Sequence, residues 1–381
     1  MHAEPSAEKA SWHLPASFSA LVLTCFFFSG LTGLIYELVW TRMIIKVIGA
    51  APFAVSIILT VFMGGLGLGS FIAAKTIDRV QEPRLLLRLY ALLELAIGGY
   101  GIILPGLLML SKPFYSILYN QLFSHFLIYS VVTLIGCLIL LILPSTFMGA
   151  TLPVLCRFYI VQLGHVGTRS GRLYALNTIG AAAGSFVCGF WLIAWLGVSG
   201  SLISAVLINS AIGMLCLAAS YRIASRPPMQ EHLPPSGRTV DAIPDPAADA
   251  LPGASSAHRF ITLSIFALSG FCAMAYEVIW SRLLGLIIGP TIYSFTIILT
   301  TFITGLGLGS LVFGWLADRT GKPLRLLIHT QLFAAVLALG VSQLLGKDAP
   351  EDGDGGGIGG IHAKEGEALR KQALPPAVGR V

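Results

Sequence analysis

Three acidic residues, Glu37, Glu94 and Glu277, lie inside long apolar stretches of the sequence. A carboxylate within a membrane-spanning helix is costly to bury, and such residues are typical of substrate pathways and ion sites. Glu37 and Glu277 both sit toward the outer end of an apolar stretch, where a cationic ligand such as an amine would suit them. All three glutamates are therefore candidate cation or substrate contacts.

The pair formed by Glu37 and Glu277 also has a structural interpretation. Each glutamate stands five residues before an arginine, Arg42 or Arg282, and could pair with it at the membrane surface. The two arginines are thus candidate charge partners, and the sequence leaves both interpretations open.

Glu94 lies well inside its own apolar stretch. It could hold a proton or a cation, or it could be a hydrogen-bonded structural acid or face Arg88. We find no nucleophile–base pair, metal-ligand cluster or phosphate-binding loop anywhere in the sequence. It therefore predicts no catalytic residue, no metal site and no cofactor.

The composition indicates which elements must position these acids. Only 11% of the 381 residues are charged, whereas a soluble domain carries roughly 25%. The mean hydropathy is +0.82, and continuous apolar runs are long enough to cross a bilayer core of about 30 Å as helices. The runs do not alternate in polarity, which argues against a membrane barrel. We therefore expect the lipid bilayer to be the main partner.

The basic residues point to a membrane topology and not to nucleic acid. The formal charge is +6, but lysines and arginines gather at the ends of the apolar runs, in every second loop. This pattern is typical of multi-pass membrane proteins. It predicts a cytoplasmic N-terminus and no nucleic-acid binding.

We expect an all-α polytopic membrane protein with about nine transmembrane helices. The expected spans are residues 17–40, 53–75, 85–110, 126–156, 173–196, 199–221, 260–283, 291–316 and 325–346. The fourth contains Pro144 and Pro153, and the loop charges favour one kinked helix there. Outside the spans we expect a cytoplasmic N-terminus (1–16), a disordered Pro-rich cytoplasmic linker (222–259) and a low-complexity tail (347–381).

An internal repeat is the strongest pattern in the sequence. Residues match across a constant offset of 240, without a gap. The matches include Ser29-Gly30 with Ser269-Gly270, Tyr36-Glu37 with Tyr276-Glu277, Trp40 with Trp280, and Leu66-Gly67-Leu68-Gly69-Ser70 with Leu306-Gly307-Leu308-Gly309-Ser310. Because the copies begin six spans apart, they share one orientation, as in the six-helix halves of major-facilitator transporters. The sequence predicts a complete first half (17–221) and a partial, three-helix second half (260–346).

A short charged motif recurs after the second span of each copy. The segment from Gly314 to Pro323 contains Asp318-Arg319 and resembles the signature loop of the major facilitator superfamily, and Asp78-Arg79 takes the same place in the first copy. Such a carboxylate can hold a neighbouring helix end or an arginine and thereby latch one gating state. The alternative is a helix end with mixed charges.

The glycine-rich segments favour close helix packing. Gly64–Ser70 and Gly180–Ser185 have neither the spacing nor the preceding strand of a phosphate-binding loop. Glycines at this density allow helix backbones to approach one another.

Several motifs together resemble one family. The segment from Ser29 to Arg42, followed by the glycine-rich second span, resembles the membrane portion of bacterial fused transporter–spermidine synthase-like proteins. Leu143–Pro153 and Gly171–Gly180 are similar to the same family. The resemblance covers residues 17–221 and 260–346, and it implies a major-facilitator-like fold in a bacterial inner membrane.

The same resemblance implies a function in moving or channelling an amine or related metabolite, such as a polyamine. In that family an aminopropyltransferase-type domain usually follows the membrane portion. This sequence contains neither that domain nor the last three spans, so we expect no aminopropyltransferase activity, and a truncated or frame-shifted product is our hypothesis. Two alternatives stay open. One is an ordinary secondary transporter whose chains associate as homo-oligomers, and the other is a non-transporting anchor or inactive fragment.

Overall fold

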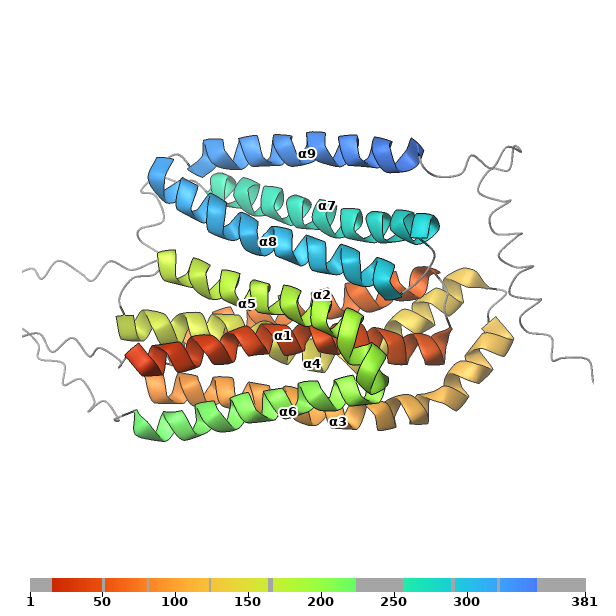
Figure 1. Cartoon of the computed structure of the whole chain (residues 1–381), viewed down its shortest axis with the longest axis horizontal. Coiled ribbons are helices and arrows are strands. Elements are labelled where there is room, and N and C mark those ends of the chain that lie inside the picture. Colours follow the sequence, from red (N-terminus) through yellow and green to blue (C-terminus); the bar gives the residue numbers. More distant parts are fainter. Residues whose placement is uncertain are drawn as a thin grey trace, which may run out of the picture.

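A computed structural model describes residues 16–49, 52–80, 82–122, 125–163, 167–223, 256–288, 292–320 and 323–347, and every element in these ranges is helical (Figure 1). The elements are α1 (Ala16–Ile48), α2 (Pro52–Thr76), the 3-10 turn η1 (Ile77–Arg79), α3 (Pro83–Leu122), α4 (Phe126–Leu163), α5 (Gly167–Val187), the π-helical turn η2 (Cys188–Leu192), α6 (Ile193–Arg222), α7 (Ser256–Ile288), α8 (Ile292–Thr320) and α9 (Pro323–Lys347). The expected N-terminal segment, linker and tail lie almost entirely outside the described residues.

Eight helical segments of the described chain are long and apolar enough to cross a membrane. The expectation of an all-α multi-pass membrane protein is therefore confirmed. The expected fourth span is one continuous helix, α4, with Pro144 and Pro153 inside it. The fifth of the eight segments, Leu173–Arg222, is 50 residues long and covers two of the expected spans.

The chain turns back inside that long segment. Gly197 has φ 68° and ψ −177°, a conformation that is essentially restricted to glycine. On either side of this residue, α5 and α6 run in opposite directions (Figure 1). Gly197 thus makes a tight connection between two helices where the hydropathy alone shows a single apolar run.

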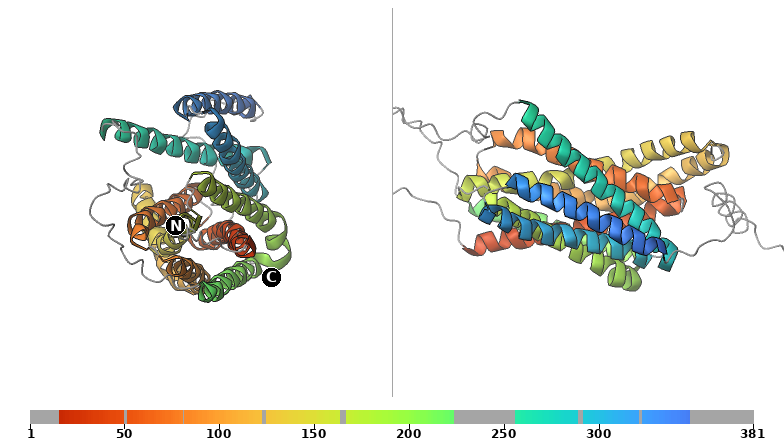
Figure 2. Two further views of the ribbon diagram at one scale, coloured as in Figure 1. Left: turned by 90° about the vertical axis from the view of Figure 1, so that its left-hand side faces the viewer. Right: turned by 90° about the horizontal axis from the view of Figure 1, so that it is seen from above.

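The first six helices form one packed group. Seen end-on, α1 to α6 lie together and α7 to α9 lie against one side of them (Figure 2). Within the group, α1 contacts α5 and α6, α2 pairs with α4, and α3 packs between α4 and α6. The buried clusters centre on large side chains such as Trp40, Tyr36 and Phe158, and they come almost entirely from this group.

The second group is packed much more thinly. Only α8 makes an extended contact with the first group, along α5 and η2. Ser185 and Thr300 share a hydrogen bond of 3.0 Å in this contact, and Leu299 and Ile303 extend the buried core into α8. In the apolar windows of α7 and α9 only 6% of residues are buried, compared with 33% in α1. Most of the second group therefore presents its side chains outward.

Glycines set the closest helix contacts in the first group. A Cβ on Gly65 would overlap the Ser145 side chain of α4, and one on Gly69 would overlap the carbonyl of Thr146. Gly184 of α5 lies equally close to the Leu31 backbone of α1. These contacts confirm the packing interpretation of the glycine-rich segments.

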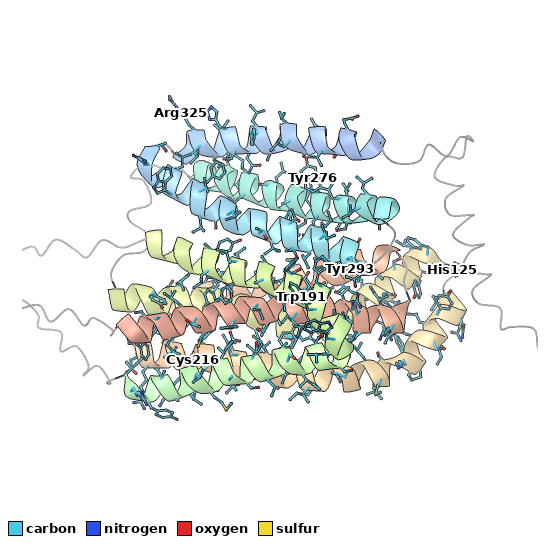
Figure 3. All side chains as sticks on the ribbon, viewed as in Figure 1. His125, Trp191, Cys216, Tyr276, Tyr293 and Arg325 are labelled. Atoms are coloured by element: carbon cyan, nitrogen blue, oxygen red, sulfur yellow. The ribbon has the colours of Figure 1, made fainter. Side chains whose placement is uncertain are left out.

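Most basic residues lie at one end of the bundle, where α1, α3, α5, α7 and α9 begin. Their side chains include Lys75, Arg79, Arg84, Arg88, Arg157, Arg222, Arg319 and Arg325. Figure 3 places Arg325 at this end and His125 at the other. The opposite half of the bundle carries fewer described basic residues, which include Arg42, Lys46, Lys112 and Arg282. The basic residues are thus separated along the bundle axis as the sequence predicts.

Candidate functional site

Glu37 on α1 and Glu277 on α7 are both buried, with relative exposures of 2% and 1%. None of their four carboxyl oxygens has a hydrogen-bond partner among the described residues. The two groups lie close enough to interact electrostatically. The structure therefore places the repeat-related glutamates, one from each copy, within electrostatic range of each other.

Aromatic residues accompany each glutamate. Trp40 and Trp280 follow at the i+3 position, so each shares a helix face with its glutamate. The Tyr36 and Trp40 ring centroids are 4.8 Å apart, and those of Tyr276 and Trp280 are stacked at 5.4 Å. Figure 3 shows Tyr276 midway along α7. Within the described chain neither indole N–H has a hydrogen-bond partner.

Arg42, one of the two arginines expected as charge partners, has other neighbours. Arg42 is half-buried beside Cys188 of η2 and Tyr293 at the start of α8, and Figure 3 shows Tyr293 at that place. Arg282 is exposed on α7. The structure thus does not join Glu37 to Arg42, and the charged group that influences Glu37 electrostatically is Glu277.

Glu94 on α3 is completely buried in the first group. Its carboxylate accepts a hydrogen bond of 2.5 Å from the Ser29 hydroxyl of α1. The Tyr36 and Tyr90 hydroxyls are near enough to interact with it electrostatically. Arg88 points away, because its guanidinium contacts α6 instead. Glu94 is therefore held by a neutral hydroxyl, separately from the Glu37–Glu277 pair.

Arg88 makes two contacts at the end of α6. Its Nε donates a hydrogen bond of 3.3 Å to the Ser220 hydroxyl, and its guanidinium lies 4.7 Å from the centroid of the Tyr221 ring. The contact between Arg88 and Glu94 that the sequence left open is not formed.

The second copy retains the serine but not the acid. Ala334 takes the place of Glu94, and the Ser269 hydroxyl accepts a hydrogen bond of 2.8 Å from the Gln331 side chain of α9. In each copy, then, the serine of the first helix binds a polar group of the third. Only the first copy places a titratable group there.

The Asp78 side chain contacts an arginine on a neighbouring helix. Arg157 of α4 lies 3.8 Å from the Asp78 carboxylate and donates a hydrogen bond of 3.1 Å to the Asp78 carbonyl. Asp78 is exposed, so this ion pair is screened by solvent and contributes less than about 1 kcal/mol. In the second copy, Arg319 lies over the Trp315 ring, and the Asp318 side chain lies outside the described residues. The gating function of both motifs stays a prediction.

Two asparagines and a histidine differ in their surroundings. The Asn177 side chain of α5 donates a hydrogen bond of 3.1 Å to the Phe26 carbonyl of α1, as expected of a residue that joins helices. The Asn209 carbonyl oxygen is buried without a partner among the described residues. His329 is exposed and contacts the Arg325 carbonyl of its own helix.

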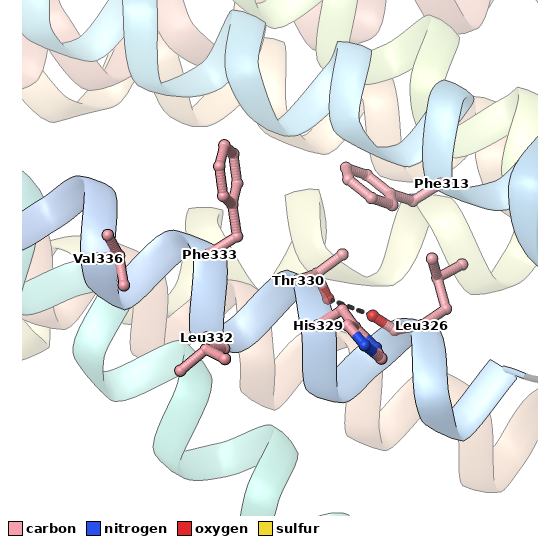
Figure 4. Close-up of a pocket in the computed structure, with 7 residues that line it drawn as sticks. All are labelled: Phe313, Leu326, His329, Thr330, Leu332, Phe333 and Val336. Atoms are coloured by element: carbon pink, nitrogen blue, oxygen red, sulfur yellow. Dashed lines mark hydrogen bonds between the residues drawn. The ribbon is translucent and has the colours of Figure 1, made fainter.

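Figure 4 shows a shallow apolar hollow between α8 and α9. It is lined by Phe313, Leu326, His329, Thr330, Leu332, Phe333 and Val336. None of the candidate site residues lies there. This hollow is therefore not part of the glutamate site.

The sequence did not indicate the partners of its own candidates. Ser29 is the donor to Glu94, and Arg157 is the partner of Asp78. One signal was available for the first contact, because Ser29 belongs to the repeated Ser-Gly pair. Within the described residues no three His, Cys, Asp or Glu side chains form a group that could hold a metal ion.

Comparison with protein-family models, with curated proteins and with solved structures finds no significant match for this chain. Function must be argued from the geometry alone.

Proposed function

We propose that this chain is a membrane protein that binds and moves a small organic cation, and that Glu37 and Glu277 are its binding groups. The observation that carries the proposal is that two buried carboxyl groups, one from each copy of the repeat, lie within electrostatic range of each other and have no hydrogen-bond partner among the described residues. A di- or polyamine carries ammonium groups along a flexible apolar chain, which suits two acids presented from opposite sides.

The energetics of the pair support a cationic ligand. Two carboxylates within electrostatic range of each other in a low-dielectric interior repel, and each is costly to ionise without a partner. The two groups can therefore lose their protons without this cost only if a positive charge takes the place of the protons. Protons and an amine would then compete for one site. The flanking faces of Trp40 and Trp280 add a surface that can stabilise an ammonium group.

The same proposal includes the finer topology. Nine crossings, with the N-terminus in the cytoplasm of a bacterial inner membrane, would follow if α5 and α6 cross separately on either side of Gly197. A major-facilitator-like arrangement of related halves, as in the membrane portion of spermidine synthase-like fusions, is supported by the parallel repeat. The inward position of the glutamates favours transport over a simple anchor, because an anchor has no need for buried acids.

Amine binding by the purified protein tests the proposal. We expect spermidine to bind to the chain in lipid nanodiscs, and Glu37→Gln or Glu277→Gln to weaken binding about tenfold or more, the equivalent of ~1.4 kcal/mol. The matched control is Glu82→Gln, because Glu82 is exposed at the start of α3. Isothermal titration calorimetry at several pH values would measure both affinity and proton release. Equal affinities for all the variants would show that the glutamate pair is not the site.

A further inference from the structure

We propose that α7 and α8 form a docking surface for a pair of transmembrane helices with the chemistry of α4 and α5. The surface involves neither Glu37 nor Glu277, so it is independent of the proposed cation site. The internal repeat supplies the comparison, since it shows what covers the same residues in the first copy.

In the first copy, α2 receives α4 along a face of small residues. Gly65 and Gly69 have no room for a Cβ because α4 lies directly against them. The next residue, Ser70, donates a hydrogen bond of 2.8 Å to the Gly149 carbonyl of α4. This face is therefore a helix-binding surface with both shape and a polar contact.

The same face of α8 meets no helix in the described chain. Gly305 and Gly309 are the counterparts of Gly65 and Gly69, and a Cβ on either would have nothing within 4 Å among the described residues. Ser310 donates its hydrogen bond to Gly307 of its own helix, at 2.8 Å. The repeat has thus kept the α4-binding residues on a face of α8 that no described helix covers.

The first helices of the two copies show the same contrast. Gly30 of α1 lies against the Asn177 backbone of α5. Its counterpart, Gly270 of α7, has open space around it within the described chain, and the neighbouring Phe271 is 72% exposed. Phe271 takes the place of Leu31, which packs against Gly184 of α5. A face that binds α5 in the first copy is exposed in the second.

A third contact places the second helix of the pair. A Cβ built on Gly307 of α8 would lie 3.4 Å from side-chain atoms of Thr178 and Ile179 of α5. Its counterpart, Gly67 of α2, has nothing within 4 Å in the part that the structure describes. If the halves are related by the repeat, an α5-like helix on α7 would also reach Gly67. The open faces at Gly67 of α2 and Gly270 of α7 would then contact the same helix, which would lie between α2 and α7.

The occupant must be two apolar helices with small residues on their inner faces. Residues 348–381 contain no apolar run long enough to cross a membrane, so this segment does not supply them. A second copy of the chain is a poor fit, because its own α4 and α5 are already held against α2 and α1 by backbone contact. We therefore assign the surface to an α4–α5-like helix pair from outside this sequence.

A helix hairpin from this protein can serve as the probe. We would co-express the full chain carrying Ser310→Cys with a tagged hairpin of residues 125–187 carrying Ala150→Cys. Ala150 is chosen because its backbone nitrogen would lie 3.0 Å from a Cβ built on Gly69, the residue before Ser70. Mild oxidation of isolated membranes should produce a disulfide between the two chains. The yield is normalised to the hairpin recovered in the membrane fraction, and the hairpin without Ala150→Cys gives the background from native cysteines.

Gly305→Leu in the full chain is the decisive variant. It should lower the cross-link about tenfold or more, because it removes the close backbone approach, while the open space around Gly305 leaves the chain itself folded. Gly314→Leu is the matched control, since its counterpart Ala74 is exposed, and it should leave the yield unchanged. The proposal is overturned if the membrane-inserted hairpin does not cross-link, or if Gly305→Leu has no effect on the yield. It is also overturned if the hairpin cross-links better to a full chain with Ser70→Cys in the first copy. A disulfide between two full chains that carry Ser310→Cys, in place of one to the hairpin, would overturn it as well.

Discussion

Ser29 donates a hydrogen bond to a completely buried acid. Its hydroxyl reaches Glu94 across the α1–α3 interface, and Arg88, which precedes Glu94 on α3, is engaged at Ser220 and not at this carboxylate. A carboxyl group in such surroundings depends on every available donor. The corresponding serine of the second copy contacts an amide in an exposed place, so the two serines offer an internal comparison.

Ser29→Ala should therefore destabilise the protein more than Ser269→Ala. Interhelical hydrogen bonds in membranes contribute about 0.6 kcal/mol on average and up to ~1.7 kcal/mol, and we expect the Ser29 bond to lie in the upper part of that range. Thermal unfolding in detergent would measure the difference between the two variants. If both lowered the midpoint equally, the buried environment of Glu94 would add nothing to this bond.

The sequence identified the acids but not their partners. Glu94 stands out because it interrupts an apolar run, a local feature. Ser29 lies 65 residues away, and a serine in an apolar run has many ordinary explanations. The approach of Glu37 to Glu277 was also beyond the sequence. A repeat shows which residues are equivalent, but it does not show which surfaces of the two copies meet.

At the scale of the helices, two glycines with the same repeat position should respond differently to substitution. Gly69→Ala forces a Cβ into the Thr146 backbone of α4, and overpacking of this kind costs about 1–3 kcal/mol. Gly309→Ala meets only open space in the described chain and should change stability by less than about 0.5 kcal/mol. Fluorescence-detected size-exclusion after a heating series would compare them. Similar losses for both variants would mean that the two copies pack alike.

The turn at Gly197 makes a second prediction for an element. Its positive φ is strained for any residue with a Cβ, although the space around it is open in the described chain. Gly197→Ala should therefore cost about 1–3 kcal/mol through the backbone alone. Gly99→Ala is the control, because Gly99 is equally open but helical, and alanine is favoured in a helix by ~1 kcal/mol. Opposite shifts in the unfolding midpoint are expected, and a neutral Gly197→Ala would contradict the strain.

Helix positions were largely predictable, because length and apolar content decide them. Both prolines of α4 fit inside one helix, as the loop charges required. The expected boundary between the spans 173–196 and 199–221 coincides with the reversal at Gly197, although both helices belong to one apolar segment. The pairing of α8 with α5 had no local signal, because it depends on how the two groups dock.

For the whole molecule, the separation of basic residues along the bundle predicts the orientation. The end that carries Arg79 and Arg325 should face the cytoplasm. A cysteine in place of exposed Glu82 should react with a membrane-impermeant maleimide only after cells are permeabilised, while His125→Cys should react in intact cells. The unsubstituted chain gives the background from native cysteines. The reverse labelling pattern would invert the proposed topology.

The uneven distribution of buried side chains has a consequence for biosynthesis. Both buried clusters come from α1 to α6, apart from Leu299 and Ile303 of α8. Because a ribosome adds about 5–20 residues per second, the stretch between Arg222 and Ser256 delays α7 by roughly a few seconds. In that interval the first six helices can complete their own packing. Nascent α8 then meets a finished α5 surface, so the early part of the chain acts as the template on which the later part assembles.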